Sequence, residues 1–275
     1  MPLLALALAV AVVQFTLPSL RTDIDRFRAD AKQVKGEVTV EVRSTLDVNL
    51  DGALIDDRWL ARLEKFSRIR RIDLDDVPIS DAGLKHFRNL MKLEWLDLAR
   101  TQVQNDGLRE LRRLSKLEVL VLNGTSIGDA GLVHLSGLQN LRELRLDQTE
   151  ISDSGLAHLS GLTRLRGLSL MDTDVANSGL RHLLGLTKLR LLSLGGTDVD
   201  DDGLPYLREL PRLSYLDLHE TEITDTGLKY LESFQALKYV SLRGCPVTSE
   251  AVSKLRNVQP NCLVDYQPPA LPRRQ

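Results

Sequence analysis

Four aspartates near the start of the chain have the residue type and the spacing of a ligand-binding cluster. Asp51 and Asp75 are 24 residues apart, and so are Asp73 and Asp97. On neighbouring strands of a sheet, about 4.8 Å apart, their carboxylates would form one negative surface. Carboxylate oxygens are ligands that calcium prefers, and an acidic surface also attracts basic partners. No loop supplies further calcium ligands, so we predict a protein partner with no metal and no cofactor, and keep calcium as the alternative.

Four of the five histidines are separated by multiples of 24 residues. Packed helices lie about 9–10 Å apart, whereas a metal needs its ligands about 2 Å away. We therefore interpret this column as helix packing and not as a metal site. The column is His86, His134, His158 and His182, continued by Tyr206 and Tyr230.

The chain carries no motif of an enzyme nucleophile or a phosphate-binding loop. It lacks G-x-S-x-G, a P-loop and H-E-x-x-H. An open sheet also offers poor shelter for a cluster of reactive groups. We therefore predict that the protein is not an enzyme.

A 24-residue repeat accounts for these spacings. From Ile69 to Pro260 the chain divides into eight blocks that follow L-x-x-L-x-L-x-x-T-x-[IV]-x-[DN]-x-G-L-x-x-L-x-x-L, and residues 45–68 fit the same register more loosely. We predict nine repeats over residues 45–260. One block cannot bury its own leucines, so its neighbours must complete its core.

Each block contains the signals of one strand and one short helix. In the block 141–164, Leu144 and Leu146 alternate as in a strand with one buried face. The hydroxyl of Thr149 can bond to backbone groups of the following turn. Asp153 and the Asp, Asn or Ser at the same place in every block are predicted to be helix N-caps. Leucines spaced three residues apart then form the apolar stripe of the helix.

These elements predict an open α/β solenoid. The strands of successive blocks form one parallel sheet on the concave side, and the helices cover the convex side. Gly155 and its counterparts are expected to let the neighbouring coil pack closely. The blocks resemble leucine-rich repeats of the 24-residue form ending in T-x-[IV]-[ST]-D-x-G-L, which is common in bacterial repeat proteins. The resemblance covers residues 45–260 and implies a leucine-rich-repeat solenoid shaped as a curved horseshoe.

Both ends of the solenoid need caps, and the sequence provides candidates. Residues 21–44 contain an amphipathic helix that Gly36 ends, followed by a strand in which valines alternate with polar residues. Residues 261–267 are predicted to close the sheet with a strand, and residues 268–275 to form a disordered tail. The apolar helix face is Leu20, Ile24, Phe27, Ala31 and Val34, and the valines are Val38, Val40 and Val42.

Residues 1–20 form an apolar leader, unbroken from Leu3 to Val13. The leader is shorter than the roughly 20 apolar residues of a spanning helix and lacks the basic region of a signal peptide. We predict that residues 3–20 are a membrane anchor or export signal, which places the protein in the cell envelope, with cleavage and topology open. A buried helix in a cytoplasmic protein is the alternative. The order of leader, helix, strand and repeats resembles that of anchored bacterial leucine-rich-repeat proteins.

The two cysteines are predicted to be free thiols. In repeat register Cys245 lies beside position 269, about 23 Å along the strand from Cys262. A disulfide spans at most about 7 Å between Cα atoms.

The third, fifth, seventh and eighth residues of each block are expected to face the concave surface. Their charges sum to −7 in a chain of net charge −2, so we predict an acidic face that binds a basic protein or peptide. The candidate contact residues are Asp51, Arg71, Asp73, Asp75, Asp76, Trp95, Asp97, Arg100, Glu143, Arg145, Tyr215, Asp217 and Tyr239.

Trp95 is the strongest candidate for an interaction anchor, because an exposed aromatic side chain ringed by charges has the composition of a binding hot spot. Tyr215 and Tyr239 share its column and form a second candidate. The alternative is that all three are ordinary solvated strand residues.

The composition narrows the class of function. Lys and Arg total 36 against 38 Asp and Glu, which lacks the cation excess of a general nucleic-acid binder. We expect a monomeric binding scaffold. The alternatives are a soluble adaptor, similar to the repeat half of ubiquitin-ligase substrate receptors, and a structural spacer in the envelope.

Overall fold

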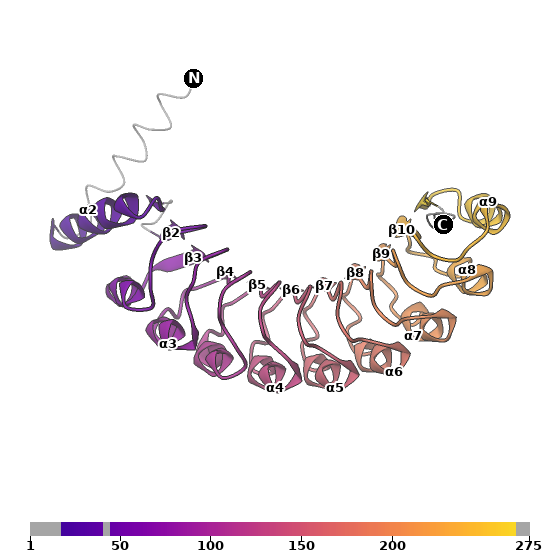
Figure 1. The fold of residues 1–275 in the computed structure, drawn as a ribbon, viewed down its shortest axis with the longest axis horizontal. Helices are drawn as coiled ribbons and strands as arrows, with labels where there is room; N and C mark the ends of the chain where they lie inside the picture. The colour runs from indigo at the N-terminus through magenta and orange to yellow at the C-terminus, as the bar shows by residue number, and fades with distance from the viewer. Residues whose placement is uncertain (1–17, 41–44, 268–275) are drawn as a thin grey trace, which may run out of the picture.

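The structure is a computed structural model that describes residues 18–40 and 45–267. The described residues form eleven strands in one sheet, and their spatial order follows the chain from β1 to β11. The strands from β2 onwards are parallel, and β1 pairs with β2 in the antiparallel sense. The sheet lines the inner side of an arc and the helices its outer side (Figure 1). This confirms the predicted solenoid with a parallel concave sheet and convex helices.

The strands are short, and from β5 onwards each begins 24 residues after the one before it. They are β1 (Glu37–Val40), β2 (Leu46–Asn49), β3 (Ile69–Asp73), β4 (Trp95–Asp97), β5 (Val119–Val121), β6 (Glu143–Arg145), β7 (Gly167–Ser169), β8 (Leu191–Ser193), β9 (Tyr215–Asp217), β10 (Tyr239–Ser241) and β11 (Leu263–Asp265).

The convex helices combine α and 3₁₀ turns. Leucines spaced three apart match the three residues per turn of a 3₁₀ helix, so most α turns pass directly into one. The α-helices are α2 (Pro18–Gln33), α3 (Asp81–Leu84), α4 (Asp129–Leu132), α5 (Asp153–Leu156), α6 (Asn177–Leu180), α7 (Leu204–Arg208), α8 (Asp225–Leu231) and α9 (Ser249–Val258). The 3₁₀ helices are η2 (Trp59–Lys65), η3 (Lys85–Phe87), η4 (Gly107–Arg113), η5 (Val133–Leu135), η6 (Ala157–Leu159), η7 (Arg181–Leu183) and η8 (Asp201–Gly203).

The leucines of strands and helices build one continuous core. Leu144, Leu146 and Leu156 have no exposed surface, and the same holds for most of their counterparts. Below this core the hydroxyl of Thr149 donates to the carbonyl oxygen of Leu146. This confirms that the threonine binds the turn backbone, as do Thr101, Thr125, Thr173, Thr197 and Thr221 in their own coils.

The aspartate after each strand has a role that differs from the predicted one. In α4, Asp129 is the first helical residue, and the N-cap is Gly128. Oδ1 of Asp129 accepts the backbone N–H of Ser152 in the next coil at 2.8 Å, and Oδ2 accepts the Ser152 hydroxyl at 2.6 Å. Ser152 itself caps α5 through the N–H of Ser154. The N-cap prediction is therefore wrong, because the carboxylate ties one coil to the next.

The same link joins all nine coils, always to the N–H of the residue 23 positions further on. Either Asp or Asn can serve, because the link needs one side-chain oxygen as acceptor. The acceptors are Asp57, Asp81, Asn105, Asp129, Asp153, Asn177, Asp201 and Asp225.

In the second to eighth coils a glycine lies directly against this link, and the ninth coil has Ala251 at the same position. A Cβ on Gly155 would overlap Oδ1 of Asp129, and one on Gly179 would overlap Oδ1 of Asp153. This confirms that the glycine allows the coils to approach closely. The D-x-G signature is thus one contact in which the acid of one coil meets the glycine of the next.

The N-terminal cap is the helix α2 with the strand β1. Phe27 and Ala31 are buried, and the ring of Phe27 stacks on Phe66 of the first coil with 4.6 Å between centroids. The helix ends at Gln33, and the left-handed residue of the turn that follows is Lys35, with a φ of 67°, and not Gly36 as predicted. Gly36 is required for a different reason, because a Cβ there would overlap the side chain of Leu50.

The C-terminal cap is the helix α9 with the strand β11, which pairs with β10. Both cysteines are buried and unpaired, as predicted. The thiol of Cys245 donates to the carbonyl oxygen of Leu218 at 2.9 Å. Burial raises the pKa of Cys245 and of Cys262, which disfavours the reactive thiolate.

Parts of the predicted ends lie outside the described residues. These are residues 1–17 of the leader, Val42 of the first strand and the tail 268–275. Residues 18–20 belong to α2. Among the helices of the described part, none combines the length and the apolar content that a membrane span requires.

Replacing Asp129 by alanine tests the link between coils. Because the N–H of Ser152 then loses its acceptor, we expect D129A to lower the free energy of unfolding by about 2 kcal/mol. D129N keeps an acceptor oxygen and should lose roughly half of this or less. Urea denaturation, monitored by circular dichroism, measures the free energy of unfolding of both variants. The control is D106A, whose side chain is 82% exposed, and equal midpoints for D129A and D106A would contradict the link.

Candidate protein-binding surface on the concave sheet

The structure places nine of the thirteen predicted contact residues on strands and four in the turns that follow. The register sets Arg71 beside Trp95 and Asp73 beside Asp97, so these residues form one cluster. The strand residues are Arg71 and Asp73 on β3, Trp95 and Asp97 on β4, Glu143 and Arg145 on β6, Tyr215 and Asp217 on β9, and Tyr239 on β10. The turn residues are Asp51, Asp75, Asp76 and Arg100.

The acids in the fifth position of a coil hold the turn after their strand. Oδ1 of Asp97 accepts the backbone N–H of Ala99 at 2.9 Å. Asp73 and Asp217 make the same bond to the N–H two residues further on. These carboxylates therefore have a structural role in addition to any contact with a partner, a role that the repeat pattern did not indicate.

The eighth residue of every coil adopts a left-handed backbone, whatever its side chain. Asp76 and Arg100 have φ values of 56° and 53°. Glycine adopts this conformation without strain, whereas these side chains are held in it by the turn. The nine residues are Gly52, Asp76, Arg100, Gly124, Gln148, Asp172, Gly196, Glu220 and Gly244.

Trp95 is partly buried, not exposed as predicted, and a cation covers it. The guanidinium carbon of Arg71 lies 4.2 Å from the centroid of its ring, a cation–π contact. The other arginine of the cluster, Arg100, forms an ion pair with Asp75. A partner that stacks on this face of the ring would therefore have to displace Arg71.

The acids on β3 and β4 are crowded. Burial raises the pKa of Asp97 to about 6, and the carboxylates of Asp73 and Asp75 add to this rise. Burial also raises the pKa of Asp73, with further increases from Asp51 and Asp75. Oδ1 of Asp75 is buried and has no hydrogen-bond partner in the described part of the chain. A cation placed among these oxygens would relieve their repulsion.

Tyr215 and Tyr239 form the second predicted cluster. Their rings stack with centroids 4.5 Å apart and planes within 7° of each other. The hydroxyl of Tyr239 donates to Asp265 at 3.1 Å. Burial, with this bond and the charge of Asp265, raises the pKa of Tyr239 to about 12. The pair is a rigid aromatic platform that stays neutral at physiological pH.

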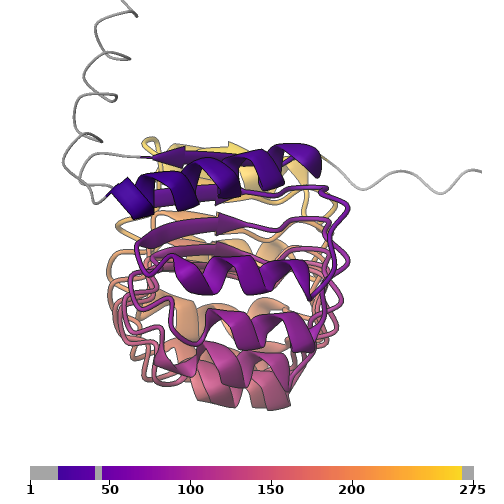
Figure 2. The same cartoon turned by 90° about the vertical axis from the view of Figure 1, so that its left-hand side faces the viewer.

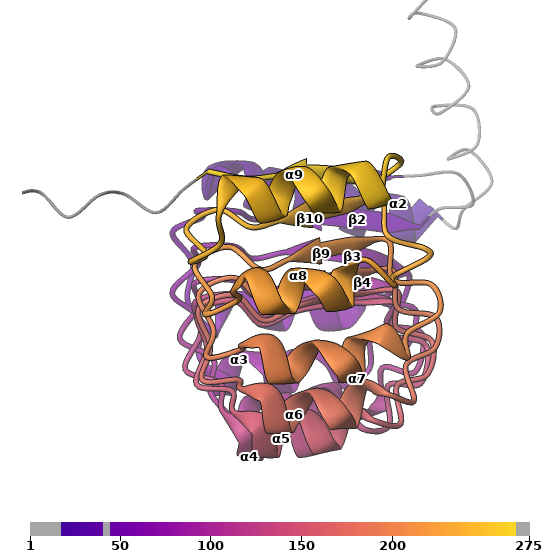
Figure 3. The same cartoon turned by 90° about the vertical axis from the view of Figure 1, so that its right-hand side faces the viewer.

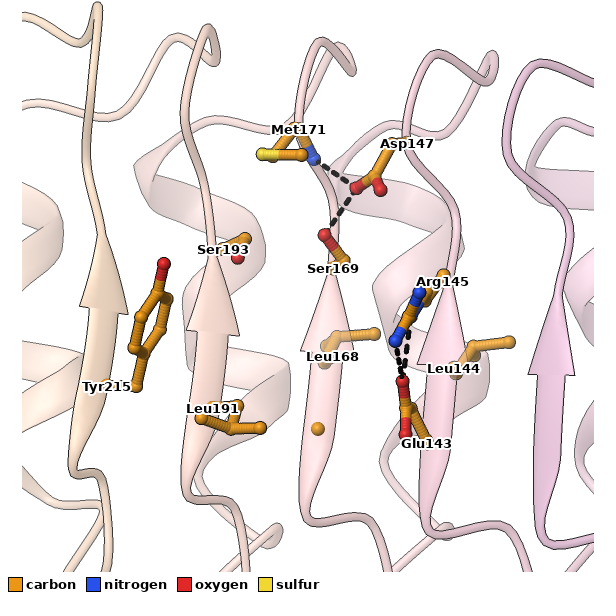
Figure 4. Close-up of a pocket in the computed structure, with 11 residues that line it drawn as sticks. Glu143, Leu144, Arg145, Asp147, Leu168, Ser169, Met171, Leu191, Ser193 and Tyr215 are labelled. Carbon is orange, nitrogen blue, oxygen red and sulfur yellow. Dashed lines mark hydrogen bonds and ion pairs between the residues drawn. The ribbon is translucent and has the colours of Figure 1, made fainter. Parts of the chain in front are cut away.

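Between the two clusters lies a hollow of about 340 Å³ that sequence reasoning missed. It opens where Gly167 leaves the third column without a side chain, and Leu191 in the same column is 49% exposed. Figure 4 shows Tyr215 on one side and the pair of Glu143 and Arg145 on the other. This pair is bonded at 2.7 Å, so two predicted contact residues neutralise each other. The interruption of a charged and aromatic column by Gly167 and Leu191 is the signal that could have located the hollow.

The histidine column and the acidic cluster are the candidate metal ligands. In the described part of the chain, no group of three or more His, Cys, Asp or Glu side chains is arranged to hold a metal ion. His86 of the histidine column instead contacts Glu64 of the preceding coil.

This geometry, with one strand and one short helix per coil and a sheet that curves inward, defines a class of repeat solenoid. The family model described as Leucine Rich repeat matches residues 113–136 and 137–160. The chain is therefore a leucine-rich-repeat protein.

Two solved structures from Listeria monocytogenes are similar to it. The crystal structure of internalin C2 is 29% identical, with a TM-score of 0.54, and the match covers 68% of this chain and 76% of that one. The crystal structure of internalin F is 16% identical, with a TM-score of 0.43, over 74% of this chain and 76% of that one. No curated protein shows a significant match to the chain.

Asp97→Asn tests the crowding of the acids. The pKa of Asp97 is about 6 in the folded protein and 3.8 ordinarily, so between these values the folded state binds more protons than the unfolded state. Through this group, the wild-type protein loses stability as the pH rises from about 4 to about 6. D97N removes this loss and keeps an acceptor for the N–H of Ala99.

We expect D97N to be about 1 kcal/mol more stable than wild type at pH 7, after allowance for solvent screening, and similar to it at pH 4. Urea denaturation at the two pH values measures the difference. A variant less stable than wild type at pH 7 would show that Asp97 is not under electrostatic strain.

Proposed function

We propose that the protein is a non-catalytic scaffold whose concave sheet binds a basic segment of a protein or peptide. The observation that carries this proposal is the cluster of Asp73, Asp75 and Asp97. Their carboxylates repel one another, and a lysine or arginine of a partner would stabilise their ionised forms. The sheet is fixed by bonds between coils, so docking costs the scaffold little conformational entropy.

The two clusters also suggest how long the recognised segment is. From β4 to β9 there are five strand steps, which correspond to about 24 Å across the sheet. An extended chain covers this distance with about seven residues. We infer that a basic residue sits among the acids while an aromatic or cationic residue stacks on Tyr215 and Tyr239. An apolar residue between them would enter the hollow beside Leu191.

A pair of charge-neutral variants tests the acidic cluster. D73N/D97N removes two charges and retains the oxygens that hold the turns. D198N/D202N is the matched control, because it removes two exposed acids from the seventh coil, away from the cluster. The probe is a fluorescently labelled twelve-residue peptide of alternating arginine and serine. Its binding is measured by fluorescence anisotropy at low salt.

We expect D73N/D97N to weaken binding roughly tenfold or more and the control to have little effect. Equal losses in the two variants would mean that the peptide responds only to overall charge, and the concave proposal would then fail.

We also propose that the protein is exported or membrane-anchored, on the strength of its apolar leader. Full-length protein with a C-terminal tag would be expressed in bacteria beside L6R/V10R, which interrupts the apolar run with two charges. Membrane and soluble fractions are separated, and protease access to the tag is measured in intact cells and spheroplasts. We expect the wild-type tag to become cleavable in spheroplasts and the variant to stay protected. A wild-type tag in the cytosolic fraction would refute this.

A further inference from the structure

The solenoid carries opposite charges on its two flanks. In each 24-residue coil, counted from residue 45, positions 7–16 form what we term the turn flank, from the end of the strand through the first helical turn. Positions 17–24 and the first two residues of the next coil form the return flank. The turn flank contains 21 acidic and three basic residues, and the return flank contains 23 basic and six acidic residues. Figures 2 and 3 show the connecting loops on opposite sides of the strands and helices.

The acids of the turn flank have a structural explanation. Six of them accept the hydrogen bonds that join the coils, and five of these six lie in the first turns of helices, where negative charge is favourable. Such an explanation does not extend to the return flank. Cations near a helix C-terminus are favourable only within the last helical turn. Many basic residues of the return flank lie beyond that turn, where the chain enters the next strand.

A row of exposed cations marks this side of the central coils. The N–H of Arg166 donates to the carbonyl oxygen of Arg142 at 2.7 Å, and that of Arg190 to the carbonyl oxygen of Arg166 at 2.8 Å. These arginines therefore follow one another at the spacing of strands, about 4.8 Å. The row is Arg142, Arg164, Arg166, Lys188, Arg190 and Arg212.

Acids of the same flank neutralise only part of this charge. Five of its six glutamates already have an arginine or lysine partner in the flank, and the sixth, Glu64, contacts His86. The side chains of Arg166, Lys188, Arg190 and Arg212 make no ion pair or hydrogen bond with any described residue. The surplus positive charge therefore faces solvent.

Apolar side chains accompany the cations. Of the nine large hydrophobic side chains that are most exposed in the described part, six lie on the return flank. Leucine, methionine and tyrosine among arginine and lysine are typical of surfaces that rest at the interface of a bilayer. The six are Met91, Val133, Leu184, Tyr206, Tyr230 and Val258.

The topology adds an independent indication. The parallel strands run from the return flank to the turn flank, and β1 runs in the opposite direction. A short connection joins α2 to β1, and the helix lies along that strand (Figure 2). Because α2 therefore ends on the turn flank, it begins on the return flank. The apolar leader joins the described chain on the side where the cations gather.

We propose that the return flank docks on an anionic lipid bilayer. Its cations meet lipid phosphates, and its scattered apolar side chains enter the interfacial layer. A linear polyanion would also be attracted by the row of arginines. The exposed hydrophobic side chains and the start of α2 on this flank favour the bilayer. This surface is distinct from the concave sheet and does not depend on the function proposed for it.

Vesicle binding by the full-length protein tests the proposal. The vesicles are pure phosphatidylcholine or contain about 30% phosphatidylglycerol, and the difference in affinity between them reports the electrostatic contribution. Binding through the leader is common to both and cancels. R166Q/R190Q removes two cations of the row, and the matched control R58Q/R243Q removes two exposed cations of the turn flank.

We expect R166Q/R190Q to bind the anionic vesicles about thirtyfold more weakly than wild type and the control to bind like wild type. Equal affinity of the wild-type protein for both vesicle types would overturn the proposal. A second result would also overturn it. If R166Q/R190Q weakened binding to heparin but not binding to the anionic vesicles, the flank would be a site for linear polyanions.

A second measurement does not rely on removing charges. An environment-sensitive fluorophore is attached to L184C on the return flank or to L54C on the turn flank, both exposed positions, while the native cysteines are buried. We expect a blue shift on anionic vesicles for the label at 184 and none for the label at 54. The reverse pattern, or equal shifts, would exclude docking through the return flank.

Discussion

One side-chain oxygen per coil, bound to a backbone N–H of the next coil, sets the geometry on which the rest of this structure depends. The bond from Asp129 to Ser152 and its seven equivalents hold successive turns together. In seven of the nine coils a glycine in the first helical turn makes room for that oxygen. Because every coil is positioned in this way, residues 24 apart align across the sheet. The concave columns and the two charged flanks are consequences of that alignment.

Much of the fold could be predicted from the sequence, because buried leucines recur with a period that only a stack of coils satisfies. The role of Asp129 could not. Aspartate and asparagine are favoured both at N-caps and as acceptors of backbone N–H groups, so residue type alone cannot tell a local bond from one to the next coil. The predicted cap and the observed cap differ by one residue, since the N-cap of α5 is Ser152 and not Asp153.

The candidate surface was predictable in its columns but not in its contacts. Register places Arg71 beside Trp95, yet the sequence does not say that the arginine lies over the ring. Glu143 and Arg145 each contribute a charge to the sum over the concave face, but the sequence does not say that they form an ion pair with each other. The hollow at Gly167 arises from an absent side chain, and a search for chemically active residues overlooks such positions. If the return flank rests on a bilayer, the strands stand upright on it and the concave sheet stays open to a partner alongside.

The bonds between coils also give the chain a natural unit of length. Every link crosses one coil boundary with the same separation in sequence, and no described link of this kind reaches beyond its neighbour. Loss or duplication of one whole unit in the middle of a gene would rejoin an acceptor with an equivalent donor. A change of any other length would set leucines against solvent and leave both groups unmatched. Recombination can therefore lengthen or shorten such an arc only in whole coils, and the caps at either end need not change.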